Sequence, residues 1–294
     1  MCISFFILGI VLLLLQQSGI INLTALQDAP NYEDVGVVRD FRIEQLISDV
    51  FLFIVPVIVI SFLVSRNRLH YLQVNKMGGT LLLLLGAVTI VVATPFISYV
   101  GELNAKIPLP NQLKNLEDMG DAIETALMAH HTITDLLLNL LVMALAAAIC
   151  EEFFFRAGLQ KIIIAMTKNV HIGIWITAIV FSAIHLQFSG FFQRMLLGGF
   201  LGYLFVWSGS IWVNILAHFI FNAFQIIVPY MQDAKATSGL VDGIFSATPP
   251  YGYIIISTVL VVFLMVLIYR QSVKSRVVED SNNSEHFFPG NKVL

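Results

Sequence analysis

Eight long apolar stretches determine what this chain can fold into. They cover about residues 3–21, 46–64, 80–100, 133–155, 171–188, 192–208, 211–230 and 252–269. A helix needs about 20 mostly apolar residues to cross a bilayer, so these stretches have the length of membrane spans. Charged residues make up 12% of the chain, against about a quarter in soluble domains. The sequence therefore predicts an all-α, polytopic integral membrane protein of about eight transmembrane helices.

The charges between the spans predict how the chain is oriented. Basic residues follow the second, fourth and eighth spans: Arg66, Arg68 and Lys76; Lys161 and Lys168; Arg270, Lys274 and Arg276. The loops 22–45 and 101–131 are dominated by acids. Since cytoplasmic loops are enriched in Lys and Arg, both termini are expected in the cytoplasm. The first stretch lacks the positive start of a signal peptide and is interpreted as a retained helix.

The N-terminus and the net charge limit the expected location and partners. The short N-terminus and the lack of a targeting segment favour a bacterial inner membrane. The net charge of −3 provides no basic field for nucleic acid. The expected partners are membrane lipids and a substrate in or at the membrane.

Ionisable side chains inside these spans stand out, because they are costly in a bilayer and are functional by default. Glu151, Glu152 and Arg156 form "EEFFFR" in the middle of an apolar run, and His185 closes "FSAIH". His218 and Asn222 begin and end "HFIFN". Asp49 and Asp135 also occur, but near span ends, where a solvated edge position explains them.

Helical geometry groups these residues. Glu152 and Arg156 are four residues apart and can pair along one helix face, whereas Glu151 points about 100° away. If Glu152 neutralises Arg156, Glu151 remains as the free carboxylate. His218 and Asn222 are also four residues apart and face one neighbour together.

The depth of each residue in the membrane gives a further expectation. A turn near Lys168-Asn169 would place residue 152 opposite residue 185, so that the carboxylates and His185 meet. His218 lies only nine residues after the turn at 208–210, so its depth matches less well. Bringing it level requires unequal helix lengths or an irregular turn near 157–161.

At this point the motifs become recognisable. "EEFFFR", "FSAIH" and "HFIFN" resemble the three ordered motifs of the CPBP intramembrane metalloproteases, a family that includes the type II CAAX prenyl endopeptidases. The resemblance covers about residues 130–230. It implies peptide-bond hydrolysis in a polar cavity open to the cytosol and the membrane, on a membrane-associated or prenylated substrate. It implies that Glu151 activates water, that His185 and His218 order that water or hold a metal, that Glu152 and Arg156 form a supporting pair, and that Asn222 stabilises the oxyanion.

The cofactor expected with these residues is Zn²⁺. A catalytic zinc typically has three protein ligands and one open water position, and lowers the pKa of the bound water to about 7. His185, His218 and one glutamate, Glu151 in the resemblance, can supply the ligands. A metal-free route, in which a glutamate and a histidine activate the water, is the alternative.

Two other functions compete with hydrolysis. A proton-coupled transporter also uses buried Glu, Arg and His, but predicts polar residues spread over many spans and inverted repeats. A non-catalytic membrane scaffold or immunity-type protein could keep the same residues for structure. We divide the chain into N-terminal membrane helices with acidic outer loops (1–130), a catalytic membrane core (131–270) and a polar, disordered cytoplasmic tail (271–294).

Overall fold

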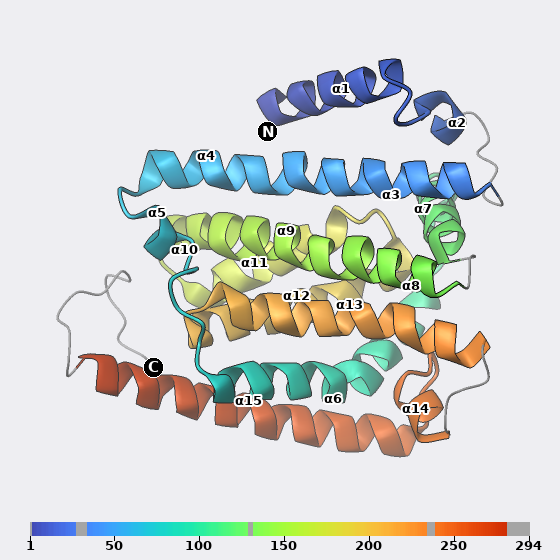
Figure 1. The fold of residues 1–294 in the computed structure, drawn as a ribbon. Helices are drawn as coiled ribbons and strands as arrows, with labels where there is room; N and C mark the ends of the chain where they lie inside the picture. Colours follow the sequence, from blue (N-terminus) through green and yellow to red (C-terminus); the bar gives the residue numbers. More distant parts are fainter. Residues whose placement is uncertain (1, 28–33, 129–131, 234–238, 281–294) are drawn as a thin grey trace.

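The computed structural model describes residues 2–27, 34–128, 132–233 and 239–280, and the regular structure in these ranges is helical (Figure 1). In chain order the helices are α1 (Cys2–Gln17), α2 (Leu23–Gln27), α3 (Val35–Asp49), η1 (Val50–Ile54), α4 (Val55–Val64), α5 (Arg68–Tyr71), α6 (Thr80–Ala105), α7 (Asn111–Met128), α8 (Ile133–Asn139), η2 (Leu140–Ala146), α9 (Ala147–Glu152), η3 (Phe153–Gln160), α10 (Lys161–Thr167), α11 (Val170–Ala183), η4 (Phe188–Gly190), α12 (Phe191–Ser208), α13 (Ile211–Asp233), α14 (Gly239–Ile244) and α15 (Tyr251–Asp280).

Each of the eight predicted spans is helical. Within the described ranges, five helices are long and apolar enough to cross a membrane: Val35–Val64, Thr80–Ala105, Ile133–Thr167, Ile211–Gln232 and Tyr251–Lys274. The remaining predicted spans correspond to the shorter helices α1, α11 and α12. The predicted all-α, polytopic membrane fold is therefore confirmed.

Two boundaries differ from the prediction. The second span begins at Val35 rather than near residue 46, because the polar start of α3 continues into the apolar helix without a break. At the other end of the chain α15 runs to Asp280. Residues 271–280 of the predicted disordered tail are therefore helical, and the prediction for 281–294 lies outside the described residues.

The central core joins the N-terminal part of the chain to the part that carries the three motifs. Its buried side chains come from α6, α12, α13 and α15, and include Leu82, Ile90, Leu201, Leu204, Val213 and Ile268. Because α6 contributes directly to this core, the third predicted span helps to support the motif-bearing helices.

The long helix Ile133–Thr167, which carries both glutamates, is irregular on either side of them. The π-helical segments η2 and η3 flank the short α-helical segment α9. Segments of this kind are rare and occur often at functional sites. Of the two expected solutions, unequal helix lengths or an irregular turn near 157–161, the second overlaps η3. The predicted turn follows at Lys168, whose φ is +54°, and at Asn169, whose side chain caps α11.

The two ends of the bundle are built differently (Figure 1). At the end where α4 and α10 finish, the segment 65–79 is bound to the start of α13. There the Ser210 hydroxyl donates to the Lys76 carbonyl (2.6 Å) and the Trp212 indole donates to the Val74 carbonyl (2.9 Å). At the opposite end α7 lies across the bundle, roughly perpendicular to the long helices. The basic connections lie at the first end and the acidic loops at the second.

Candidate active site

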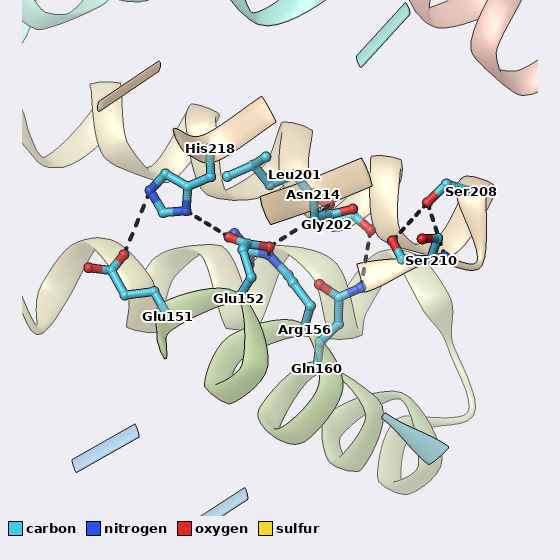
Figure 2. A network of polar contacts seen from close by, with 10 residues as sticks. All are labelled: Glu151, Glu152, Arg156, Gln160, Leu201, Gly202, Ser208, Ser210, Asn214 and His218. Carbon is cyan, nitrogen blue, oxygen red and sulfur yellow. Dashed lines mark hydrogen bonds and ion pairs between the residues drawn. The ribbon is translucent and has the colours of Figure 1, made fainter. Parts of the chain in front are cut away.

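Glu152 is the centre of a buried polar network between α9 and α13 (Figure 2). Its Oε2 accepts hydrogen bonds from Arg156 Nε (3.0 Å) and Asn214 Nδ2 (3.1 Å). Its Oε1 lies 2.9 Å from His218 Nδ1. The side chains of Glu152 and Arg156 are both 0% exposed. The i,i+4 pair predicted between them is therefore confirmed, and both oxygens of this carboxylate are engaged.

Glu151 has a different environment from its neighbour. Its side chain is 13% exposed, and its Oε2 lies 3.7 Å from His218 Nε2. Figure 2 shows the two carboxylates on opposite sides of the imidazole, one facing each ring nitrogen. Glu151 is thus the carboxylate that the Arg156 pairing leaves available, as the helical geometry predicts.

The contact with Glu152 determines the tautomer that we assign to His218. An ionised carboxylate can only accept hydrogen bonds, so Nδ1 carries the proton that is shared with Glu152 Oε1. The other ring nitrogen, Nε2, then faces Glu151. A buried imidazole held in one tautomer by a carboxylate can take a proton from a molecule placed between Nε2 and Glu151.

His185 does not lie where the depth argument placed it. Helix α11 ends at Ala183, so His185 falls in the turn that follows rather than in the span. Its Nδ1 contacts the Phe181 carbonyl (2.7 Å), instead of a glutamate. It is His218, not His185, that meets the carboxylates, since His185 lies past the end of α11.

Phe181 connects the two histidines. Its ring centroid lies 5.0 Å from that of His185 and 5.9 Å from that of His218, with edge-on geometry in both cases. The first residue of "FSAIH" therefore packs between the imidazoles. Asn222, half-buried one turn after His218, places its Nδ2 3.5 Å from the Met143 carbonyl, at the limit of a hydrogen bond.

Asn214 belongs to this network but was missed in the sequence. Besides Glu152, its amide donates to the Leu201 carbonyl (2.6 Å). It lies four residues before His218, as Asn222 lies four residues after it, so the three side chains share one face of α13. This four-residue spacing from His218 is the sequence pattern from which Asn214 could have been predicted. Gln160 is fully buried and lies one turn after Arg156. Its Nε2 donates a hydrogen bond to the Gly202 carbonyl (3.1 Å).

The solvated-edge interpretation of two aspartates is wrong. Asp49 is 4% exposed and accepts a hydrogen bond from Gln45 Nε2 (2.9 Å). Asp135 forms an ion pair with Arg42 (3.0 Å), a residue of α3 that is itself buried. Asp49 is thus buried, and Asp135, whose side chain is 13% exposed, is largely covered by its contact with α3.

The residues predicted to bind zinc are only partly brought together. Glu151 and His218 face each other, whereas His185 lies beyond the Phe181 ring. Among the described residues there is no group of three or more His, Cys, Asp and Glu side chains arranged to hold a metal ion. The donor set thus falls short of the three ligands that a catalytic zinc typically uses.

Comparison with known proteins places this site in a recognised segment. Residues 133–224 match the family described as Type II CAAX prenyl endopeptidase Rce1-like, and this range contains all three motifs. The chain is also 29% identical over 89 residues to the uncharacterized protein YpbD of Bacillus subtilis (strain 168). That match covers 29% of this chain and 42% of YpbD, so the chain aligns with less than half of that relative. No solved structure matches.

Proposed function

Because residues 133–224 match the Rce1-like family of type II CAAX prenyl endopeptidases, we propose that this multi-pass membrane protein is an intramembrane endopeptidase. Its substrate would be a membrane-associated peptide or protein, with a prenylated C-terminus as the class that the family name suggests. One observation carries the proposal: Glu152 is fully occupied by Arg156, Asn214 and His218, which leaves His218 Nε2 directed at the available carboxylate of Glu151.

In the proposed reaction a water molecule lies between Glu151 and His218. Glu151 takes a proton from the water, and the resulting hydroxide attacks the carbonyl carbon of the scissile bond. His218 Nε2 orients the water by accepting a hydrogen bond from it, and Glu152 holds the imidazole in place through Nδ1. When the C–N bond breaks, the proton held by Glu151 passes to the leaving amine, so that one water is consumed per peptide bond.

The remaining motif residues have supporting roles in this proposal. Asn222, on the same face of α13 as His218, would donate its amide N–H to the oxyanion of the tetrahedral intermediate. His185 would contact the substrate or the water from the far side of Phe181. Arg156 pairs with Glu152 and holds it in place, so it acts through Glu152 and His218 rather than on the substrate.

Zinc stays a prediction from the sequence, and no step of this mechanism passes through it. Glu151 and His218 are the two predicted ligands that the structure brings together. Location in a bacterial inner membrane, with both termini cytoplasmic, is likewise a proposal. It is supported by the basic connections gathered at one end of the bundle and the acidic loops at the other.

The test is cleavage of a fluorogenic farnesylated peptide with a CAAX terminus by the purified protein in lipid nanodiscs. Glu151→Gln keeps the shape of the side chain but removes the base, and we expect a loss of kcat of about 10² to 10⁴-fold. Glu44→Gln, which changes an acid of α3 on a different helix, serves as the matched control and should retain activity. Equal cleavage by wild type and Glu151→Gln would refute the proposal, and absence of cleavage of every lipidated peptide would favour the non-catalytic scaffold.

A further inference from the structure

The turn that carries His185 is held only weakly by its own backbone hydrogen bonds. After α11 ends, His185 N lies 3.4 Å from the Ser182 carbonyl and Leu186 N lies 3.3 Å from the Ala183 carbonyl, both long hydrogen bonds. Leu186 has a φ of +56°, in the left-handed region that is unfavourable for a residue with a Cβ. A residue in such a conformation persists only where the surrounding structure enforces it. The position of His185 therefore depends on contacts made by the residues that follow.

Those contacts come first from α7. The carboxylate of Glu117 accepts hydrogen bonds from the Ser189 backbone N–H (3.1 Å) and from the Ser189 hydroxyl. Gln187 Nε2 donates to Asp121 Oδ1 (2.7 Å) and to Glu124 Oε2 (3.3 Å). Glu117 is only 5% exposed, although α7 is otherwise a largely exposed helix. Burying a carboxylate is costly unless it is hydrogen-bonded, so the two bonds from Ser189 to Glu117 form a specific attachment of the turn to α7.

The opposite side of the turn is held by two other helices. Arg194, in α12, donates to Gln187 Oε1 (3.1 Å) and to the Gln187 carbonyl. Asn104, at the end of α6, donates to the Phe188 carbonyl (3.0 Å) and accepts from the Phe192 N–H (2.7 Å). The turn is thus fixed from α6, α7 and α12 by side chains that bind residues 187–192.

We propose that Glu117 is a positioning residue for His185. By holding Ser189, it fixes the strained turn at Leu186 and keeps the imidazole against Phe181, whose ring also contacts His218. Glu117 lies outside the segment 133–224 and outside the three motifs, so neither the family match nor the sequence pattern assigns it. This inference deepens the proposed function and rests on it, since it gives His185 its place at that site.

The experiment uses the full-length protein in nanodiscs with Glu117→Ala and Glu117→Gln. Asp118→Ala, which changes the exposed neighbouring acid of the same helix, is the matched control. The first readout is the rate at which diethylpyrocarbonate modifies His185, measured by mass spectrometry. His171, an exposed histidine near the start of α11, is the internal reference. The second readout is kcat and KM for the farnesylated peptide.

We expect Glu117→Ala to raise the modification rate of His185 several-fold while that of His171 is unchanged. We also expect kcat to fall between about 10- and 100-fold, as is usual for a displaced group at a reaction centre, with little change in KM. Glu117→Gln should be intermediate, because its neutral amide oxygen accepts weaker hydrogen bonds than the carboxylate. Should Glu117→Ala fail to fold, Ser189→Ala removes the hydroxyl donor from the loop side and should shift both readouts less, in the same direction.

A second substitution separates positioning from a general structural role. Glycine adopts a positive φ without steric cost, so Leu186→Gly should recover part of the kcat lost in Glu117→Ala. A role confined to holding α7 on the bundle would give no recovery. An unchanged His185 modification rate in a folded Glu117→Ala protein would overturn the proposal. If the wild type cleaves nothing, the proposed function fails, and the modification rates alone still decide whether Glu117 positions His185.

Discussion

Replacement of Arg156 by methionine tests the energetic centre of the site. The change removes the only cation that contacts Glu152 within the described network and keeps a long side chain in the same volume. Because the carboxylate is 0% exposed, water cannot replace the lost partner. Breaking a buried pair on one side costs about 3–5 kcal/mol, more than the ~1–3 kcal/mol of an unsatisfied neutral group. That is a large fraction of a total stability of about 5–15 kcal/mol.

The chain provides its own comparison for this variant. Lys106 and Glu102 form another i,i+4 pair, with an N–O distance of 2.8 Å, but the lysine side chain is 63% exposed. Exposed pairs of this kind commonly contribute nothing measurable to stability, so Lys106→Met should unfold like the wild type. The two variants thus have the same spacing and the same charge change, and differ in burial.

Denaturant unfolding in mixed micelles, followed by circular dichroism, measures both. We expect Arg156→Met to lose about 3–5 kcal/mol, and the double variant Arg156→Met/Glu152→Gln to regain much of that loss, since the buried charge is then gone. The reasoning is refuted if Arg156→Met is as stable as Lys106→Met, or if the double variant is less stable than the single one.

Three further predictions concern the surroundings of the site. Asn214→Leu removes an N–H from a charged acceptor and should cost about 1.5–3 kcal/mol in the same unfolding assay, together with a lower kcat; unchanged values for both would show that the amide is dispensable. Gly173→Ala would bring a Cβ 3.1 Å from the Ile164 backbone nitrogen and still closer to the Ile164 side chain, so we expect the free energy of unfolding to fall by about 1–3 kcal/mol. Gly9→Ala, whose Cβ would meet nothing within 4 Å, should be neutral or stabilising. Since the third predicted zinc ligand, His185, is not in place, we expect protein purified without chelators to contain less than one zinc per chain. It should also keep its activity with 1,10-phenanthroline. One zinc per chain, lost in His218→Ala, would contradict this and support the zinc prediction.

What could be predicted from the sequence follows from periodicity within a single helix. The eight apolar stretches, the Glu152–Arg156 pair and the turn at Lys168 all depend on local spacing, and all are confirmed. The same rule, applied four residues before His218, would have found Asn214. The catalytic and metal-binding roles of the motif residues stay predictions.

The errors concern contacts between helices and the ends of helices. His185 was placed in a span because its surroundings are apolar, but α11 ends two residues earlier. Whether Asp135 is solvated depends on Arg42, which is 93 positions away in the chain. Local spacing does not determine how one helix is rotated relative to another. It therefore could not show that the imidazole of His218, and not that of His185, lies between the two glutamates.

The binding of the segment 65–79 to α13 has a consequence for where the bundle can open. Ser210 and Trp212 use backbone carbonyls of that segment, and the buried amine of Lys161 binds the Tyr71 carbonyl. Opening the bundle at this end would leave these groups without partners in a low-dielectric environment. At the end covered by α7, some of the contacts are exposed to solvent, such as those of Gln187 with Asp121 and Glu124. The bundle should therefore open less readily at the end that holds the segment 65–79 than at the end covered by α7, where water can replace some of the contacts.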